Sequence, residues 1–261
     1  MSKADELRLL REAIQTFPDA LAIWSADGRL VACSDLYARL LSPAKSGAAS
    51  GPDTGEYRSA DGRWLRRSLR RLEGGGSVEL VADVTDLRRA EQAMRFLAYH
   101  DSLTGLPNRR LLDDRLKQAI QLAQRRDRMV AALLVHLDDF RQVNDALGHG
   151  AGDTVLREVA QRLAGCVRKA DTLARAGADE FALVVCDLRD ESDCRIVADK
   201  LLLALAPEFR VGARRLRLAV SIGISLYPAD GGDGEALLRN ADAAMYRAKQ
   251  LGRNQVRFFG R

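Results

Sequence analysis

The stretch Asp171-Thr-Leu-Ala-Arg-Ala-Gly-Ala-Asp-Glu-Phe181 decides how the rest of this chain is organised. It predicts a strand, a tight turn at Gly177-Ala178 and a return strand over 181–185, because a glycine turn between two apolar runs is typical of a hairpin. Two adjacent acids, Asp179 and Glu180, stand where the return strand begins. Adjacent acids at a turn usually belong to a solvated loop, but further acids and a histidine lie within 133–153. The hairpin is therefore a candidate metal or phosphate site.

Length and composition limit the classes of protein to which this chain can belong. At 261 residues the chain has room for two domains at about 100–200 residues each. It contains no apolar run long enough to span a bilayer and no secretory leader, so we expect a cytoplasmic protein without a membrane partner. The formal charge is +5, yet no basic stripe with interleaved aromatic residues occurs. Nucleic-acid binding is therefore not expected.

Cysteine usage argues against a disulfide or zinc scaffold. The four cysteines, Cys33, Cys166, Cys186 and Cys194, show no Cys-x-x-Cys spacing and have no partnering histidine cluster. We expect them to be buried free thiols.

The N-terminal third predicts a small α+β domain. Apolar residues at helical spacing indicate a helix over 7–16, and 35–41 suits a short helix. The segment 42–55 is rich in Gly, Ala, Ser and Pro and reads as a loop. The predicted strands are 20–24, 29–33, 63–72 and 77–84.

A linker helix is predicted over 86–99. Leu87, Ala90, Met94 and Leu97 recur at spacings of three, four and three, which is the pattern of a coiled-coil seam too short to be stable alone. The seam predicts a parallel two-helix stalk that transmits a change from one domain pair to the next. The alternative is a helix that lies on its own domain.

From residue 104 onward the predicted elements alternate as strand–helix–strand–strand–helix–strand. This split β-α-β order indicates helices packed on a mostly antiparallel sheet. The segment 148–152, which contains His149, is predicted as a loop that His149 helps to shape. The predicted helices are 108–126, 140–146, 152–167, 191–205 and 234–250, and the predicted strands outside the hairpin are 130–137, 216–225 and 256–259.

Five segments resemble, in the same order, the motifs of the GGDEF family, the diguanylate cyclases of bacterial cyclic di-GMP signalling. The resemblance runs from about residue 98 to the C-terminus and implies a palm-like, nucleotidyl-cyclase-like fold over 101–261, an antiparallel sheet covered by helices. The segments are His100-Asp-Ser-Leu-Thr-Gly-Leu-Pro-Asn-Arg109, Asp138-Asp-Phe-Arg-Gln-Val-Asn-Asp-Ala-Leu-Gly-His149, Arg175-Ala-Gly-Ala-Asp-Glu-Phe181, Ser221-Ile-Gly-Ile-Ser-Leu-Tyr-Pro228 and Ala241-Asp-Ala-Ala-Met-Tyr-Arg-Ala-Lys-Gln-Leu-Gly-Arg-Asn254.

The resemblance implies a reaction in which two GTP molecules form cyclic di-GMP and two pyrophosphates with the help of Mg²⁺ (or Mn²⁺). It places Asp179 and Glu180 in catalytic positions. The metal would be held by Asp179, by the residue at position 136 and by the backbone of Leu137. His136 stands where the family has Asp, and imidazole is a poor ligand for Mg²⁺, which prefers hard oxygen donors. Asp138, two residues on and on the same face of the strand, is a partial substitute.

A second departure is Ala178, where the family has Gly. A two-residue hairpin turn often needs positive φ at both central positions, which costs a residue other than Gly roughly 1–2 kcal/mol. The methyl group would also occupy space beside a nucleotide.

At the nucleotide-binding positions, this chain keeps more of the family's residues than it does at the metal-binding position and the turn. By resemblance, Asn144 and Asp153 bind the guanine edge, and Arg141, Lys249 and Arg253 bind phosphates. Arg168 and Asp171 match the inhibitory RxxD site for cyclic di-GMP, in which an Arg is followed by an Asp one helical turn later. The alternative for this pair is an ordinary Arg–Asp contact on a helix surface.

Residues 1–85 resemble a small PAS sensor domain, through the Asp-Gly turn before a strand and the closing Asp83-Val-Thr-Asp86. The linker helix then covers 86–100. All three histidines lie outside this region and Cys33 lacks the Asn-Cys-Arg context of flavin photosensors, so neither haem nor flavin is expected. The expected role is dimerisation, through this domain and the linker helix, or binding of a small ligand. Another small α+β interaction domain is the alternative.

These expectations define two hypotheses for the function. In the first, the chain is a degenerate cyclase that binds GTP and/or cyclic di-GMP with weak or absent synthesis. In the second, it is an active diguanylate cyclase with a preference for Mn²⁺. His136 and Ala178 are the residues that separate the two.

Overall fold

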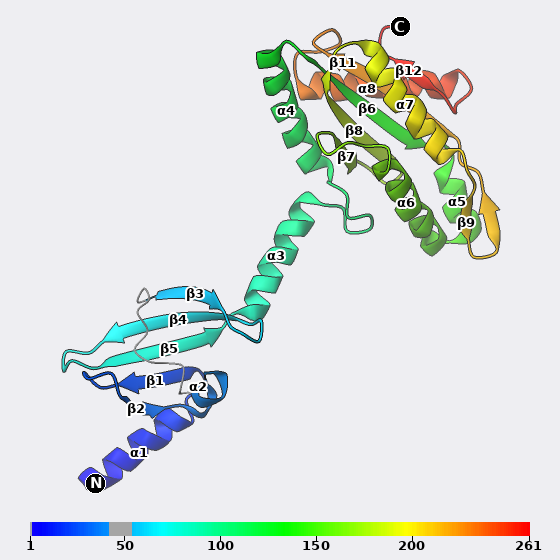
Figure 1. The fold of residues 1–261 in the computed structure, drawn as a ribbon. Helices are drawn as coiled ribbons and strands as arrows, with labels where there is room; N and C mark the ends of the chain where they lie inside the picture. The colour runs from blue at the N-terminus through cyan, green and yellow to red at the C-terminus, as the bar shows by residue number, and fades with distance from the viewer. Residues whose placement is uncertain (1, 42–53) are drawn as a thin grey trace. The chain divides into compact units, whose positions relative to one another are not determined.

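The computed structural model describes residues 2–41 and 54–261. The chain divides into two compact units, Met1–Met94 and Arg95–Arg261, and each is described by itself. Figure 1 shows a sheet in each unit, with the chain passing from one to the other through helix α3 (Thr85–Tyr99). None of the described helices is apolar and long enough to cross a bilayer.

The first unit is a five-stranded antiparallel sheet with strand order β2-β1-β5-β4-β3. All four strands predicted for this region are confirmed. Residues 54–58 form an additional strand at the end of the predicted loop, whose other residues, up to 53, lie outside the described residues. The elements are α1 (Lys3–Gln15), β1 (Ala20–Trp24), β2 (Leu30–Cys33), α2 (Asp35–Leu40), β3 (Thr54–Arg58), β4 (Trp64–Arg71) and β5 (Ser77–Asp83).

Two hairpins of this sheet are closed by the same pentapeptide, Ser-Ala-Asp-Gly-Arg, at 25–29 and 59–63. In each copy the serine hydroxyl donates a hydrogen bond to the arginine carbonyl at 3.0 Å. The glycines, Gly28 and Gly62, have φ of 79° and 88°, a conformation that favours glycine. Identical local sequences therefore produce identical turns at two places in one sheet.

A buried carboxylate lies in the core of this unit. Glu79 is 5% exposed, and one of its oxygens accepts hydrogen bonds from Trp24 Nε1 at 2.9 Å and Tyr37 Oη at 2.8 Å. The other oxygen accepts from Arg67 Nε at 2.6 Å. Because a buried charge is costly unless it is paired and hydrogen-bonded, these three partners make Glu79 tolerable in the core.

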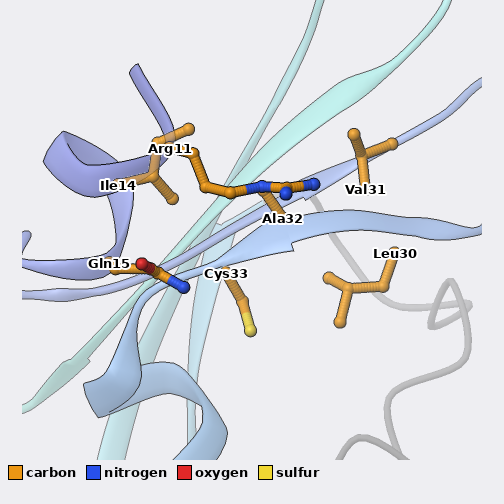
Figure 2. Close-up of a pocket in the computed structure, with 7 residues that line it drawn as sticks. All are labelled: Arg11, Ile14, Gln15, Leu30, Val31, Ala32 and Cys33. Atoms are coloured by element: carbon orange, nitrogen blue, oxygen red, sulfur yellow. The ribbon is translucent and has the colours of Figure 1, made fainter. Parts of the chain in front are cut away.

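A groove of about 260 Å³ lies between α1 and β2 (Figure 2). Figure 2 shows Arg11 and Ile14 extending from α1 toward the strand. None of the residues of α1 is buried, and Leu7 and Leu10 are 63% and 58% exposed. The helix thus keeps an uncovered apolar side. The groove is lined by Arg11, Ile14, Gln15, Leu30, Val31, Ala32 and Cys33.

The predicted linker helix is confirmed as α3. Its seam residues Leu87, Met94 and Leu97 are 48%, 71% and 56% exposed. The apolar seam is therefore uncovered in the single chain. Near the start of the helix, Arg88 pairs with Glu56 of β3.

The second unit is a five-stranded sheet with order β12-β11-β6-β8-β7, antiparallel except for the parallel pair β11–β12. The expected mostly antiparallel sheet covered by helices is confirmed. The elements are α4 (Arg109–Arg126), β6 (Met129–Leu137), α5 (Phe140–Leu147), α6 (His149–Ala164), β7 (Thr172–Arg175), β8 (Glu180–Leu188), α7 (Glu191–Leu205), β9 (Phe209–Val211), β10 (Arg214–Leu216), β11 (Val220–Tyr227), α8 (Gly234–Gln250) and β12 (Val256–Phe258).

Two apolar clusters, one on each face, hold this sheet. One contains Leu116 of α4 and Leu237 of α8, packed on the even-numbered residues of β6 such as Leu134. The other contains Val159 of α6 and Leu201 of α7. Alternation along β6 directs successive side chains to opposite faces. His136 is even-numbered and therefore lies on the α4–α8 face.

Two predictions for this unit are wrong in detail. The predicted loop 148–152 is the first turn of α6, which begins at His149 directly after Gly148. Gly148 has φ 84°, so a single left-handed residue separates α5 from α6. The predicted strand 216–225 is divided between β10 and β11, because a short β9–β10 hairpin precedes β11.

The four cysteines are free thiols, as expected, but only Cys194 is fully buried. Burial raises the pKa of Cys194 to about 12 and that of Cys186 to about 11. These two thiols are accordingly poor nucleophiles at neutral pH.

Candidate active site

The signature hairpin is wider than its sequence suggests. Strand β7 ends at Arg175 and β8 begins at Glu180, which leaves the four residues 176–179 between the two strands. Neither Gly177 nor Ala178 has a positive φ. The predicted backbone strain at Ala178 is therefore wrong, because a four-residue connection does not need the left-handed conformation that a two-residue turn does.

Arg175 fixes this turn to the segment that follows the linker helix. Its Nη1 lies 3.1 Å from both carboxylate oxygens of Asp101, and its Nη2 donates to the carbonyl of Ala178 at 2.6 Å. Asp101 also accepts hydrogen bonds from the backbone and hydroxyl of Thr104. Burial raises the pKa of Asp101, but the bonds from Thr104 and Arg175 outweigh it, and the net pKa is lowered. The turn that carries Asp179 is thus held by a partly buried ion pair.

Replacement of Asp101 by asparagine is expected to destabilise the second unit by about 2 kcal/mol at pH 7, the range for a hydrogen-bonded charge. A carboxyl whose pKa is lowered by folding stabilises the fold above its unfolded pKa of about 3.9, and this contribution is lost as the pH falls through the folded value. Urea unfolding of Asp101→Asn and wild type should therefore differ at pH 7, begin to converge as the pH falls below about 4, and coincide only below the lowered pKa of the folded state. Asp114→Asn on the exposed side of α4 is the control, and an equal loss in both variants would contradict the prediction.

His136 lies at the centre of the site. In the register of the sheet it stands opposite Glu180 of β8 and Ser221 of β11. Its Nε2 is 3.5 Å from Oδ2 of Asp179, and its Nδ1 is 3.5 Å from Oδ1 of Asp138. The imidazole therefore lies between two carboxylates, with one ring nitrogen facing each.

Asp138 faces the protein interior. Its side chain is 1% exposed, and Oδ2 accepts a hydrogen bond from Ser221 Oγ at 2.8 Å. Its backbone N–H donates to the carbonyl of Ala219. Asp179, on the other side of the imidazole, is 32% exposed. A substitute role for Asp138 as a direct, solvent-facing ligand is not supported by this geometry.

Glu180 is the second acid of the hairpin. Burial raises its pKa, as does the negative charge of Asp242 on α8. Positive charge from Arg109, His136 and Lys249 opposes this rise. Asp242, Arg109 and Ser221 were all within the quoted motifs, yet the sequence did not assign them a role, because only the folded sheet brings α4, α8 and β11 to the hairpin.

The proposed guanine-binding residues lie on α5 and α6. Asn144 on α5 lies against Gly152 on α6, where an added Cβ would overlap the Asn144 side-chain oxygen. Asp153, the residue after Gly152, is half-buried. The absence of a side chain at 152 therefore makes room for the Asn144 side chain against the turn of α6 that carries Asp153.

The three proposed phosphate-binding residues differ in where their side chains lie. Lys249 is close enough to Glu180 to affect its pKa, and Arg253 Nε lies 3.9 Å from Oδ2 of Asp139 at the start of α5. Arg141 is 92% exposed, and its contact with Asp145 is long, at 3.8 Å. The structure therefore brings Lys249 and Arg253 to the end of the sheet that holds His136, while Arg141 points into solvent.

The pair Arg168 and Asp171 does not lie on a helix. Helix α6 ends at Ala164, and the pair occupies the turn before β7. The Asp171 carboxylate accepts hydrogen bonds from the backbone N–H groups of Arg168 and Cys186. The helical placement that both interpretations assumed is wrong, because the helix stops before it reaches these residues.

Gly152→Ala is expected to lower the affinity for guanine nucleotides at least tenfold while changing stability little. The new methyl group displaces the end of the Asn144 side chain, and it approaches the Phe140 ring at 3.1 Å, so that the ring has to give by only a few tenths of an ångström. The matched control is Gly150→Ala on the same helix, where an added Cβ meets nothing within 4 Å. Calorimetric titration with a GTP analogue measures the affinity of each variant. Equal affinities in Gly152→Ala and Gly150→Ala would refute the prediction.

The geometry can now be compared with known proteins. The model of the family described as "Diguanylate cyclase, GGDEF domain" matches residues 98–255. The chain belongs to the GGDEF family. It is 50% identical over 189 residues to the bifunctional diguanylate cyclase/cyclic di-GMP phosphodiesterase MucR of Pseudomonas aeruginosa, a match that covers 72% of this chain and 27% of MucR. The chain thus spans about a quarter of the length of that relative.

Solved GGDEF structures support the same fold. The GGDEF domain of TpbB from Pseudomonas aeruginosa is 39% identical, with a TM-score of 0.60 over 62% of this chain and 94% of that one. The coiled coil and GGDEF domain of DgcB from Caulobacter crescentus, solved in complex with cyclic di-GMP, is 27% identical with a TM-score of 0.60, over 67% of this chain and 93% of that one.

The Mg²⁺ that the GGDEF family implies fits this site poorly. Mg²⁺ requires a near-octahedral set of oxygen ligands. Here one of the two expected carboxylates is an imidazole, and the acid two residues on, Asp138, is buried and bonded to Ser221. Among the described residues no group of three or more His, Cys, Asp and Glu side chains is arranged to hold a metal. The site thus offers Mg²⁺ little beyond Asp179.

Proposed function

We propose that this GGDEF domain binds GTP and/or cyclic di-GMP and has weak or absent cyclase activity with Mg²⁺. The observation that carries the proposal is the imidazole of His136, whose Nε2 stands 3.5 Å from Asp179 in the place of a metal-binding carboxylate. Loss of one anionic ligand weakens the neutralisation of phosphate charge on which phosphoryl transfer depends.

Retention of nucleotide binding rests on other residues. Asn144 keeps its position against α6 through Gly152, the residue before Asp153. The cations of Lys249 and Arg253 lie at the same end of the sheet and offer charge-assisted hydrogen bonds to phosphates. None of these four residues depends on His136, so the purine and phosphate contacts can survive when metal binding is impaired.

The second candidate function is an active diguanylate cyclase. It is favoured by Asp179 and Glu180, which are both present, and by the turn, in which Ala178 adopts an ordinary backbone conformation. In that reaction the 3′-hydroxyl of one GTP attacks the α-phosphate of another, and pyrophosphate leaves. This chain's residues would bind and orient one GTP, and a second copy would present the other.

One set of measurements separates the two candidates. Purified protein is titrated calorimetrically with a GTP analogue and with cyclic di-GMP, and GTP turnover is followed in Mg²⁺ and in Mn²⁺. The proposal expects binding of at least one nucleotide with little turnover in Mg²⁺. Turnover in Mg²⁺ at the rate of an active relative such as TpbB would support the second candidate and overturn the first. Absence of binding would overturn both.

Arg168 and Asp171 keep a place in the proposal as an inhibitory site for cyclic di-GMP. Since the Asp171 carboxylate already accepts two backbone hydrogen bonds, the exposed Arg168 would make the main contact. Arg168→Ala should then weaken binding of cyclic di-GMP but not of a GTP analogue.

We propose that the first unit is a PAS-like input domain and that the chain dimerises through this unit and α3. The uncovered seam of α3, with Met94 71% and Leu97 56% exposed, supports pairing with a second copy. Light scattering tests this proposal. Leu97→Glu should shift the mass toward the monomer, whereas Gln92→Glu, off the seam, should not.

A further inference from the structure

The groove between α1 and β2 runs along an open edge of the first sheet. β2 is the end strand of that sheet, and all four of its residues, Leu30–Cys33, line the groove. A hollow on one face of a sheet is lined by alternate residues of a strand, because successive side chains point to opposite faces. The groove therefore follows the free edge of β2, with α1 as its other wall (Figure 2).

This edge presents backbone hydrogen-bonding groups to the groove. The N–H of Ser34 donates to the carbonyl of Leu21 on β1 at 2.8 Å. Since backbone groups alternate in direction along a strand, those of the preceding residue, Cys33, point away from β1. Val31 is the extra residue of a β-bulge and has no partner residue in the register with β1. An amide group placed in the groove can therefore bond to the strand edge.

The helix side of the groove supplies a cation beside an apolar wall. Arg11 and Gln15 both line the groove and are four residues apart, so they lie on one face of α1. In Figure 2 the guanidinium of Arg11 extends across the groove toward β2. Within the part of the chain that the structure describes, neither side chain has a hydrogen-bond or ion-pair partner. The apolar lining comes from Ile14 of the helix and Leu30 of the strand.

These features together define a ligand class. We propose that the groove binds a small N-acylated amino acid with an apolar side chain. Its carboxylate pairs with the guanidinium of Arg11, a geometry that arginine favours. Its amide bonds to the backbone of the β2 edge, and its side chain packs between Ile14 and Leu30. The groove volume of about 260 Å³ is just below the usual range for ligand sites, about 300–1,000 Å³, and therefore suits a small molecule.

N-acetylleucine is the probe, and its binding to the full chain is measured by ligand-observed NMR. Two analogues each lack one group, since N-acetylleucinamide has no carboxylate and isocaproate has no amide. N-acetylleucine should bind at least tenfold more tightly than N-acetylleucinamide, because a charge-assisted hydrogen bond is lost with the carboxylate. Isocaproate should bind several-fold more weakly than N-acetylleucine, because a neutral hydrogen bond is lost with the amide. Binding here needs neither a nucleotide nor a second copy of the chain, so failure of the proposed function would leave these results unchanged.

Arg11→Gln separates the ion pair from the rest of the site. It should lower the affinity for N-acetylleucine at least tenfold and leave the affinity for N-acetylleucinamide unchanged. Arg8→Gln is the matched control, because Arg8 is exposed on the same helix and does not line the groove. Equal effects of the two variants, or an equal loss of both ligands in Arg11→Gln, would overturn the proposal.

The thiol of Cys33 reports whether the groove is occupied. N-acetylleucine should slow the alkylation of Cys33 by N-ethylmaleimide, followed by mass spectrometry, while alkylation of Cys166 in the second unit continues unchanged. Protection of Cys33 that rises with protein concentration alone would show that a second copy covers the groove. Tighter binding of a longer peptide that ends in leucine would show that the occupant is a polypeptide. Absence of binding by every probe would leave Arg11 as a charge that guards the strand edge. Each of these three results would overturn the proposal.

Discussion

His136→Asp should raise Mg²⁺-dependent synthesis of cyclic di-GMP at least tenfold over wild type. Aspartate restores an anionic oxygen ligand beside Asp179, where the structure has an imidazole nitrogen 3.5 Å away. Even partners outside the ligand shell of a metal contribute about 10–100-fold to affinity or activity, so a ligand itself should contribute no less. The product is quantified chromatographically at fixed GTP with Mg²⁺ as the only divalent cation.

A variant that adds the same charge nearby separates metal ligation from general electrostatics. Gln142 is exposed on α5, within the same motif, and Gln142→Asp should leave Mg²⁺-dependent synthesis unchanged. An increase of similar size in both variants would show that the negative charge acts at long range. No increase in His136→Asp would show that the ligand at 136 does not limit the reaction.

Gly223→Ala should unfold or severely destabilise the second unit. Gly223 is in the middle of β11, and a Cβ there would overlap the carbonyl of Ala241 and the backbone nitrogen of Met245 on α8. Since these are backbone atoms of a helix packed in the core, no rotamer change can relieve the overlap. The expected loss is roughly 3 kcal/mol or more, at the upper end for overpacking, and it should appear as a fall in melting temperature of about 6–12 °C.

Gly232→Ala is the matched comparison, because an added Cβ there meets nothing within 4 Å and the residue has no positive φ. It should melt within about 2 °C of wild type. If Gly223→Ala melted as high as Gly232→Ala, the close packing of α8 on β11 would be disproved. Because α8 carries Lys249 and lies near Glu180, loss of this packing should also abolish nucleotide binding.

Local patterns were sufficient for the elements and the family. The predicted bounds of α4, α7 and α8 agree with the structure to within a residue, and each of these helices buries one stripe of residues against the sheet. The motif order from His100 to Asn254 predicted the palm-like fold and the identity of the hairpin acids. Such information is local: it depends on spacing along the chain and not on which strands become neighbours.

Tertiary structure decided how the site works. Whether Ala178 is strained depends on the width of the turn, which pairing of β7 with β8 and the Arg175–Asp101 contact impose. Asp138 faces the interior because Ser221 of a distant strand binds it. Strand alternation predicts the face on which a side chain lies, but the partners that meet it there come from segments far away in sequence, and only the packed sheet brings their atoms within a hydrogen bond of one another.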